Sequence, residues 1–330
     1  MPGESPRLGV AVSRVLPTVA PFHLEATVRL LQRRPTNRVD TWVDDGYRRA
    51  YATSEGVWLV ETRNVGSIDE PDVRFAILNG SPSPATEAVL AASLRRTLGL
   101  DLDPAAVQRW AERKQGLRAT ALALRGFRPP RFPNLFETVG SVIPFQQLSL
   151  DAGASILGRL VDRFGASVVV DGTRSFAFPT PESVAEADLD TLRSAGLSRQ
   201  KAETLRRLAA RIVSGELKAE QFGALPTHEA IAALTQEQGI GPWSAAVILL
   251  RGFGRMEVFP PNDTGAARGL GALLALPPGP LSTEVIDRFG RYRGYLYFYS
   301  LGAQLLGRGL ITPAPRVRRG TQSSQRTSCE

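Results

Sequence analysis

The stretch GIGPWSAAVILLRGFGRMEVFPPNDTG, Gly239 to Gly265, joins a glycine-rich turn, an apolar helical segment and one isolated aspartate. Pro242 suits the first position of a helix, where its missing N–H costs nothing. The apolar residues that follow recur at the spacing of one helix face: Trp243, Ala246, Val247 and Leu250. A shorter helical pattern precedes the turn, and we expect Thr227 to cap its start. The sequence therefore predicts a helix–hairpin–helix over residues 227–253.

The turn of this hairpin has the composition of a phosphate-binding site. Its glycines permit unusual backbone conformations and let another backbone approach closely. The first N–H groups of the next helix lack intrahelical partners and lie at its positive dipole end, where phosphate binds without base readout. The predicted phosphate-binding residues are Gly239, Ile240, Gly241, Trp243 and Ser244, with Ile240 as an apolar plug against the core. The alternative is a helical hairpin whose glycines only form a tight corner.

Asp263 is the second candidate feature of the stretch. Pro260 and Pro261 fix an extended approach to it, and a helix is expected to start near Thr264. Its carboxylate has two interpretations: a plain helix N-cap, or a group that faces a cleft and stabilises positive charge on a reacting sugar. Between Gly239 and Leu270 the only acidic residues are Glu257 and Asp263, so the choice of a catalytic carboxylate is narrow.

Composition limits the classes of protein that remain. The chain has 330 residues and a net charge of +8, which suits a polyanionic partner such as double-stranded DNA. The lone cysteine, Cys329, excludes an internal disulfide framework and a cysteine-ligated cluster, and the two distant histidines disfavour a histidine metal site. Neither a run of eighteen apolar residues nor a signal-peptide pattern is present, so we expect a cytoplasmic protein without a membrane span.

The pattern along the chain predicts a mainly α-helical protein with an N-terminal α+β domain. Residues 48–64 and 73–80 alternate in hydrophobicity like strands, whereas 26–34 and 84–100 have helical spacing. From about residue 113 nearly every segment reads as helix. The expected division is a flexible arm at 1–17, the α+β domain at 18–112, a helical domain at 113–311 and a disordered basic tail at 312–330.

Residues 135–310 resemble the alkylbase DNA glycosylases of the helix–hairpin–helix, Gly/Pro…Asp superfamily, of the 3-methyladenine DNA glycosylase II type. GIGPWSAAVILLRG followed by VFPPNDTG is similar to the family's hairpin and catalytic-aspartate segment. FETVGSVIPFQQLSLDAGASILGRLVDRFG and FPTPESVAEADLDTLRSAGLSRQKAETLRRLAARI resemble the two helical stretches before it. The resemblance implies the helix–hairpin–helix DNA glycosylase fold and an enzyme of base excision repair.

The resemblance also implies roles for particular residues. Asp263 takes the catalytic aspartate position, and Trp243 the position at which the lyase branch carries its Schiff-base lysine. No lysine occurs from 219 to 330, which argues against a lyase acting through an amine. An aromatic wall favours a cationic alkylated base, for which Trp243 and Tyr292 are the candidates. Tyr292 lies in RYRG, where the family often has tryptophan in PWR, and simple core packing is the alternative for both rings.

The segment PFQQLS aligns with the family's wedge loop, which fills the gap left by a flipped nucleotide. Gln147 occupies the wedge position with Gln146 beside it, and helix packing is the alternative role for these glutamines. No cofactor is expected, although a monovalent cation at the hairpin is left open, and a monomer is expected.

The leading prediction is a monofunctional glycosylase that flips and hydrolytically excises alkylated purines, of the 3-methyladenine and 7-methylguanine type, from duplex DNA. The alternatives are a monofunctional glycosylase for another damaged base, a non-catalytic helix–hairpin–helix DNA-binding protein, and a helical adaptor that binds no nucleic acid.

Overall fold

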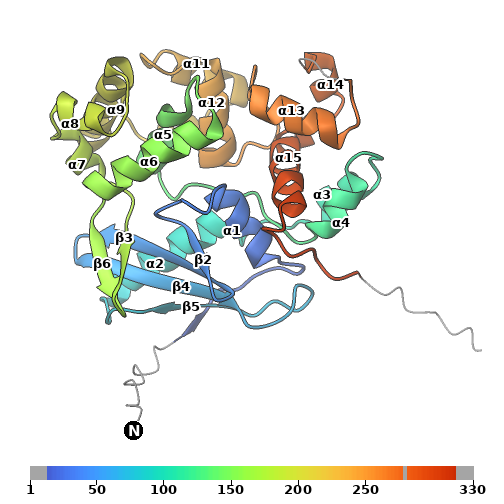
Figure 1. Cartoon of the computed structure of the whole chain (residues 1–330), viewed down its shortest axis with the longest axis horizontal. Coiled ribbons are helices and arrows are strands. Elements are labelled where there is room, and N and C mark those ends of the chain that lie inside the picture. The colour runs from blue at the N-terminus through green and yellow to red at the C-terminus, as the bar shows by residue number, and fades with distance from the viewer. Residues whose placement is uncertain (1–12, 278–280, 317–330) are drawn as a thin grey trace, which may run out of the picture.

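The N-terminal part of the chain folds around an antiparallel sheet. The computed structural model describes residues 13–277 and 281–316 (Figure 1). Five strands pair in the order β1-β5-β4-β3-β2. Their bounds are β1 (Arg14–Val15), β2 (Thr41–Val43), β3 (Gly46–Thr53), β4 (Gly56–Asn64) and β5 (Val73–Ile77). Helices α1 (Leu24–Gln32) and α2 (Pro84–Leu98) complete this part.

Period-two alternation places the strand side chains on two different faces. Tyr47, Tyr51 and Val60 belong to a buried cluster with residues of α1 and α2. Ala50 and Leu59, from the same strands, point to the opposite face and form a smaller buried cluster with Ala177. The predicted strands at 48–64 and 73–80 are thus confirmed, and both faces of the sheet are covered.

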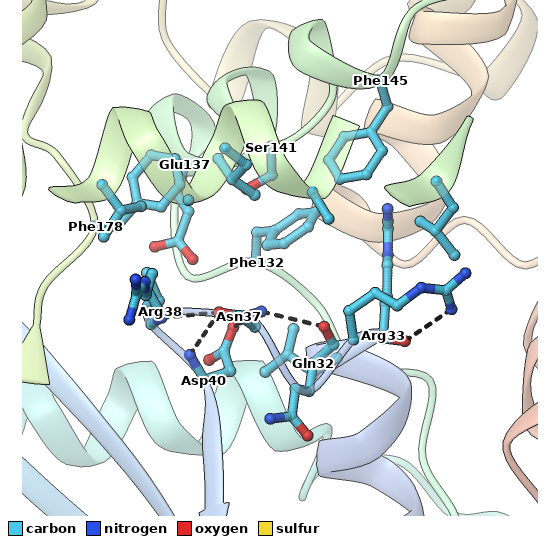
Figure 2. Close-up of a pocket in the computed structure, with 18 residues that line it drawn as sticks. Gln32, Arg33, Asn37, Arg38, Asp40, Phe132, Glu137, Ser141, Phe145 and Phe178 are labelled. Atoms are coloured by element: carbon cyan, nitrogen blue, oxygen red, sulfur yellow. Dashed lines mark hydrogen bonds between the residues drawn. The ribbon is translucent and has the colours of Figure 1, made fainter. Parts of the chain in front are cut away.

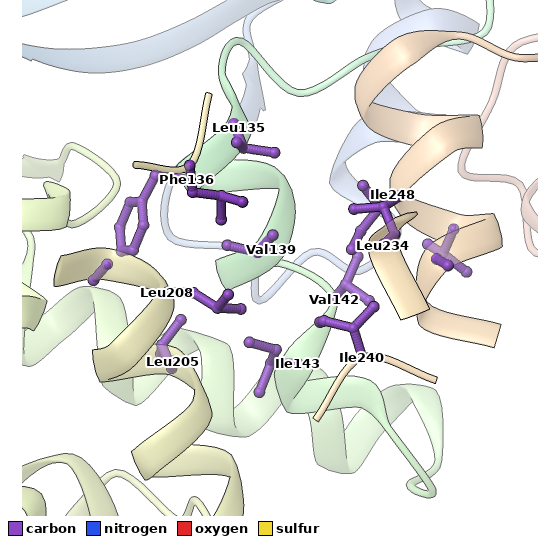
Figure 3. Packing of buried hydrophobic residues seen from close by; sticks show 14 of the residues in the cluster. Leu135, Phe136, Val139, Val142, Ile143, Leu205, Leu208, Leu234, Ile240 and Ile248 are labelled. Carbon is purple, nitrogen blue, oxygen red and sulfur yellow. The ribbon is translucent and has the colours of Figure 1, made fainter. Parts of the chain in front are cut away.

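The middle of the chain forms a helical unit around a second apolar core. Its elements are α5 (Leu135–Gly140), the 3₁₀ turn η1 (Ile143–Phe145), α6 (Leu150–Phe164), α7 (Pro181–Ala185), α8 (Leu189–Ser194), α9 (Arg199–Val213), α10 (Glu220–Gly223), α11 (Thr227–Thr235), α12 (Pro242–Ile248) and the π-helical turn η2 (Leu249–Phe253). Figure 3 shows Val139 and Ile143 of the α5–η1 region toward Leu205 and Leu208 of α9, and Val142 beside Ile240 of the hairpin. This core fixes the hairpin helices against α5 and α9.

A third core joins two separated parts of the chain. It contains α3 (Ala105–Glu112), α4 (Arg118–Ala123), α13 (Thr264–Leu273), α14 (Thr283–Asp287), the turn η3 (Gly290–Tyr292) and α15 (Arg293–Gly307). Leu117 and Leu124 pack in one buried cluster with Leu296 and Phe298 of α15. The helical part is therefore two units, and α3, which was assigned to the N-terminal domain, packs with the C-terminal helices.

One hairpin within the helical part escaped the sequence prediction. Strands β6 (Ser167–Val170) and β7 (Thr173–Phe176) pair with each other and contact β4 and β3. Ala50 and Ala177 form a parallel backbone bridge between the two parts. Asp171 and Gly172 have φ of 50° and 72°, as a two-residue hairpin turn with two positive φ angles requires. The expectation that nearly everything after residue 113 is helical is thus wrong here.

Ordered structure extends beyond the expected domain limits at both ends. Arg14 and Val15 pair with β5, so part of the predicted arm is an edge strand. At the other end, the amide of Ala314 donates to the carbonyl of Ala123 at 2.8 Å, and Thr312 is bonded to His23. Hydrogen bonds therefore hold the backbone at Thr312 and Ala314, within the segment that was predicted to be disordered. Residues 1–12 and 317–330 of the two predicted terminal segments lie outside the described residues.

The mainly α-helical architecture with an N-terminal α+β domain confirms the predicted fold class. Within the described part of the chain, no helix is both long enough and apolar enough to span a bilayer.

Candidate active site

The hairpin turn is held in place by Gly239 and Ile240. Gly239 has φ of +85°, and a Cβ built on it would lie 2.3 Å from the hydroxyl oxygen of Thr204, so no other residue fits there. Ile240 is only 4% exposed and points into the second core near Val142 (Figure 3). Gly241 is exposed, and a Cβ there would meet nothing within 4 Å. The turn is thus anchored on one side and open to solvent on the other.

The start of the first hairpin helix differs from the prediction. Pro226 occupies the N-cap position of α11, and no side chain caps the helix. The hydroxyl of Thr227 instead donates to Glu257 and accepts from Arg255 Nη1 at 3.0 Å. The expected cap at Thr227 is therefore wrong, because a proline before the helix moves the boundary by one residue and the hydroxyl binds the loop after η2.

The start of α12 has the open form expected of an anion-binding helix end. Gly241 is the N-cap with no side-chain hydrogen bond, and Pro242 follows it. The backbone amides of Trp243 and Ser244 are therefore not capped by any side chain of the described residues. The Ser244 side chain is 3% exposed and its hydroxyl accepts a hydrogen bond from Gln146 Nε2 at 2.9 Å. Only the amide of Ser244, not its hydroxyl, is placed to serve a ligand here.

Asp263 is fixed by two neutral donors. The indole Nε1–H of Trp243 donates to Oδ2 at 3.0 Å, and the amide of Ala266 donates to Oδ1 at 2.8 Å. The aspartate is thus the N-cap of α13 and is also joined to the hairpin helix. A carboxylate offers about four lone-pair sites, so about two remain after these contacts. The N-cap interpretation and the interpretation as a reactive carboxylate are therefore compatible.

No described basic side chain forms an ion pair with Asp263, although the chain has 40 lysines and arginines. The residue is partly exposed and its neighbours Asn262 and Thr264 are exposed. Chemically, this arrangement presents an oriented carboxylate to solvent at the rim of the hairpin, and no cation of the described residues neutralises it.

The two predicted wedge residues have different environments. Gln146 donates through Nε2 to the carbonyl of Gly239 at 2.8 Å as well as to Ser244, so its amide is used to hold the hairpin. Gln147 is exposed and has φ of +56°. Leu148, which the sequence reasoning did not single out, is 43% exposed at the same tip. The sequence signal for Leu148 was an isolated leucine in a polar turn. Its apolar side chain lies at the loop tip next to Gln147.

Tyr292 lies in a different contact network from Asp263. Its ring packs 4.9 Å from that of Trp110 and 6.1 Å from that of Tyr295, measured between centroids. Arg291 donates to its hydroxyl at 3.0 Å and covers its ring. The structure brings Trp243 and Asp263 together, whereas Tyr292 contacts α3 and α15, and its role in a base pocket stays a prediction.

Two family models match the chain. Residues 141–291 match the model of the HhH-GPD superfamily of base excision DNA repair proteins. The chain belongs to this superfamily. Residues 13–134 match the model of the AlkA N-terminal domain, which covers the sheet and the linking helices.

Several proteins similar to this chain carry names that describe DNA glycosylases. The DNA-3-methyladenine glycosylase of Bacillus subtilis is 27% identical over 186 residues, 56% of this chain and 61% of that protein. The DNA-3-methyladenine glycosylase 2 of Escherichia coli is 28% identical over 246 residues, 74% of this chain and 82% of that protein. The 3-methyladenine DNA glycosylase of Archaeoglobus fulgidus has a similar structure, with a TM-score of 0.73, 25% identity and coverage of 88% of this chain and 98% of that one.

The chain spans about half to three-fifths of the length of the first curated relatives it matches. The activity of this HhH-GPD superfamily member, its substrates and its partners are therefore taken up below as proposals.

Lysines are absent from the hairpin and the Asp263 segment of this superfamily member. Trp243 stands at the position that the resemblance assigns to a lyase lysine, and residues 219–330 contain no lysine. Lys201 of α9 donates through Nζ to the carbonyl of Gln146 at 2.7 Å, and partial burial lowers its pKa. Its amine is thus bonded to the backbone of the 146–149 loop, and no contact joins it to Asp263 among the described residues.

Metal ligands do not gather within residues 13–277 and 281–316, where no group of three or more His, Cys, Asp or Glu side chains could hold an ion. A monovalent cation at the hairpin would need backbone carbonyls, and that of Gly239 already accepts from Gln146. The cation therefore stays an untested prediction.

Proposed function

We propose that this chain is a monofunctional DNA glycosylase that flips and hydrolytically excises alkylated purines from duplex DNA. The observation that carries the proposal is the Asp263 carboxylate, oriented by Trp243 Nε1–H and the Ala266 amide and free of any ion pair among the described residues. The names of the Bacillus subtilis and Escherichia coli relatives support the substrate class, 3-methyladenine and similar bases.

The proposed chemistry follows from the state of the substrate. Alkylation at N3 or N7 of a purine gives a cationic base that leaves readily, so strong acid catalysis is unnecessary. As the glycosidic bond breaks, the sugar becomes oxocarbenium-like and positively charged. Asp263 faces this charge, stabilises it and orients the attacking water. A nearby arginine would neutralise the carboxylate and weaken this stabilisation, which is why the lack of an ion pair matters.

The hairpin has the proposed role of a phosphate grip. The amides of Trp243 and Ser244 lie at the open start of α12, so a DNA phosphate is the expected ligand. No lysine among the described residues contacts Asp263, which supports base release without strand cleavage by a lyase step. We further propose that the enzyme acts as a monomer, needs no cofactor, and works in the cytoplasm in association with DNA.

A flipped base requires a pocket to enter, and the gap that it leaves in the DNA stack requires a side chain to fill it. Gln147 and Leu148 at the exposed tip of the wedge loop, defined here as residues 146–149, are the proposed substitutes. The ring of Trp243 is the proposed aromatic contact for the cationic base. The proposed role of Tyr292 is to tune base preference through its packing with Trp110.

The test compares wild type with Asp263→Asn on methylated duplex DNA, with free base measured by chromatography. Asparagine keeps an oxygen for the Ala266 amide, so the N-cap is preserved while the charge is lost. We expect the single-turnover rate to fall by about 10²–10³-fold, with DNA affinity within about threefold of wild type. Equal release by both proteins would refute the role of Asp263, and DNA binding without release by either protein would indicate a non-catalytic binding module.

Base preference is settled by the same assay with a panel of duplexes. Release of 3-methyladenine and 7-methylguanine in preference to other lesions supports the proposed substrate class. Release of only a different damaged base would favour the alternative glycosylase, for which the RYRG segment at Tyr292 is the sequence departure that points to a changed pocket.

A further inference from the structure

The segment between α1 and β2 reaches across from the N-terminal domain to both ends of the wedge loop. At the start of the loop, the guanidinium of Arg33 lies 5.2 Å from the ring centroid of Phe145. At its end, Arg34 Nε lies 2.5 Å from Oδ1 of Asp151, the second residue of α6. Two consecutive arginines of one domain therefore contact the residues that flank the wedge loop of the other.

The backbone of this segment supports a specific placement of Arg33. Arg33 ends α1 with φ of +60°, a conformation that residues other than glycine seldom adopt. Such strain persists only where the surroundings hold the residue in place. At the tip of the wedge loop, Gln147 has φ of +56°. Both the contacting residue and the loop tip that it supports are thus held in an uncommon conformation.

Phe145 is confined on its other side by α6. A Cβ at Gly153 would lie 2.4 Å from the Phe145 ring, so the ring rests directly on the backbone of that helix. The amide of Leu148 donates to the carbonyl of Phe145 at 3.2 Å. Any shift of Phe145 is therefore passed directly to the exposed tip.

Packing is incomplete beside the two residues that flank the wedge loop, Phe145 and Leu150. A cavity of about 40 Å³ lies between the 33–40 segment and helices α5 and α6, and its lining includes Phe145 and Leu150, the neighbours of the loop on either side. Figure 2 shows Phe145 and Arg33 at one end of this cavity, with Glu137 and Phe178 at the other. A void removes contacts from its lining, so the directional contacts of Arg33 and Arg34 have more weight here.

We propose that Arg33 and Arg34 are positioning residues for base flipping: from the N-terminal domain they hold the wedge loop in the conformation that inserts into the DNA stack. The proposal rests on the proposed glycosylase function for its catalytic consequence. It assigns the α+β domain a part in the reaction although that domain contributes no group to Asp263.

The substrate test uses two duplexes that each contain one 7-methylguanine, opposite cytosine or opposite a mismatched thymine. A mismatch lowers the cost of flipping, so it reduces the need for an inserted wedge. For Arg34→Gln and Arg33→Met we expect the single-turnover rate on the matched duplex to fall about three- to tenfold, and on the mismatched duplex less than about twofold. Asp151→Asn should reproduce the effect of Arg34→Gln, with no further loss in the double variant.

Arg38→Gln is the matched control. Arg38 belongs to the same segment and pairs with the same helix, but at Asp162, near the far end of α6, at 3.3 Å. Its loss should leave both rates within about twofold of wild type. A general loss of stability would lower both rates in all variants by the same factor, and that result would overturn the proposal.

Amide hydrogen exchange decides the positioning without any catalytic activity. In the free protein, Arg34→Gln and Arg33→Met should each accelerate exchange of the Leu148 amide at least about threefold, whereas Arg38→Gln should not. Unchanged exchange at Leu148 would overturn the positioning role. If wild type releases no base from any duplex, the proposed function fails, and the exchange result still decides whether the two arginines hold the loop.

Discussion

Two carboxylates in this molecule, Asp263 and Glu137, are held in opposite ways. Asp263 lies partly exposed at the hairpin and, among the described residues, accepts hydrogen bonds from two neutral N–H groups. Glu137 is 3% exposed in α5 and lies 2.5 Å from Nη2 of Arg49, whose Nη1 lies 2.7 Å from Asp40. Burial raises the pKa of Glu137, which Arg49 opposes. One carboxylate is left available to a cation from outside, and the other is already matched inside the protein.

The difference separates chemistry from folding. A carboxylate that must stabilise a transient sugar cation loses that capacity if an arginine occupies it. A buried carboxylate requires such an arginine, because an uncompensated buried charge is strongly destabilising. The Arg49 cluster, formed by Arg49, Asp40, Glu137 and Tyr47, therefore joins β3 to α5, whereas the Trp243–Asp263 pair joins α12 to α13 and remains open.

The largest effect is expected from Arg49→Met, which removes the cation from the Arg49 cluster. Two buried carboxylates then lack their partner, and we expect the free energy of unfolding to fall by about 3–5 kcal/mol. Arg48→Met is the matched control, because Arg48 is the next residue and pairs with Glu61 in a partly exposed position. Its loss should cost about 0–1 kcal/mol. Denaturant titration measures both, and equal losses would contradict the comparison.

A second prediction separates the two hairpin glycines. Gly239→Ala places a side chain at φ of +85° and against Thr204, so we expect a loss of about 1–3 kcal/mol in unfolding free energy. Gly241→Ala meets nothing within 4 Å and should change stability by about 0.5 kcal/mol or less. Because Gly241 faces the proposed phosphate, its variant should weaken duplex binding at unchanged stability. Normal DNA affinity in Gly241→Ala would place the phosphate elsewhere.

Trp243→Phe tests the hydrogen bond that orients Asp263, the exposed carboxylate of the comparison. It keeps an aromatic ring but removes the N–H that orients Asp263, and we expect the single-turnover rate of base release to fall about tenfold. Trp58→Phe is the control, because it also removes an indole hydrogen bond, to Thr53 at 3.2 Å, but in the N-terminal sheet. If the two variants lose activity equally, the Trp243–Asp263 contact has no special part in catalysis.

The smallest expected effect is on the pH dependence of stability and comes from His23, a buried group that contributes to folding. Its Nδ1 accepts from the Ala26 amide and its Nε2 meets the Thr312 carbonyl at 2.9 Å, which requires the neutral ring. Burial lowers the pKa of His23 below 6.5. The unfolded chain then binds a proton more readily, so stability is full above pH 6.5 and falls as the pH drops below it. Thermal unfolding between pH 8 and 5.5 should show a weaker decline in His23→Asn, which keeps a capping oxygen. An identical decline would assign the pH dependence to other groups.

The sequence predicted elements where local signals agree with tertiary contacts. Pro242, the two glycines around Ile240 and the apolar face behind them specify a helix–hairpin–helix without knowledge of the rest of the chain. Trp243 and Asp263 were both singled out, but their hydrogen bond was not foreseen, because it depends on how α12 and α13 meet in space. The β6–β7 hairpin was missed although Asp171-Gly172 between Val-rich and aromatic segments is a hairpin signal.

Long-range pairing explains most of what the sequence could not show. The longest-range hydrogen bond of Arg49 joins it to Glu137, 88 residues away, and that of Gln146 joins it to Ser244, 98 residues away. Period-two alternation places Arg49 on the face of Tyr47 and Tyr51, but no local pattern shows that Glu137 lies within reach of it. With so many arginines, only the fold shows which of them support the structure and which remain exposed.

The backbone bridge between Ala50 and Ala177 limits where two related chains can be joined in a chimera. Val168 and Val170 of the β6–β7 hairpin pack on Ala50 and Leu59, so a segment of the helical part covers one face of the N-terminal sheet. The two family models, 13–134 and 141–291, therefore divide the chain at a point that does not separate its physical parts. A chimera with a crossover between these models would inherit a sheet from one parent and its cover from the other. A compatible exchange carries the hairpin along with the sheet.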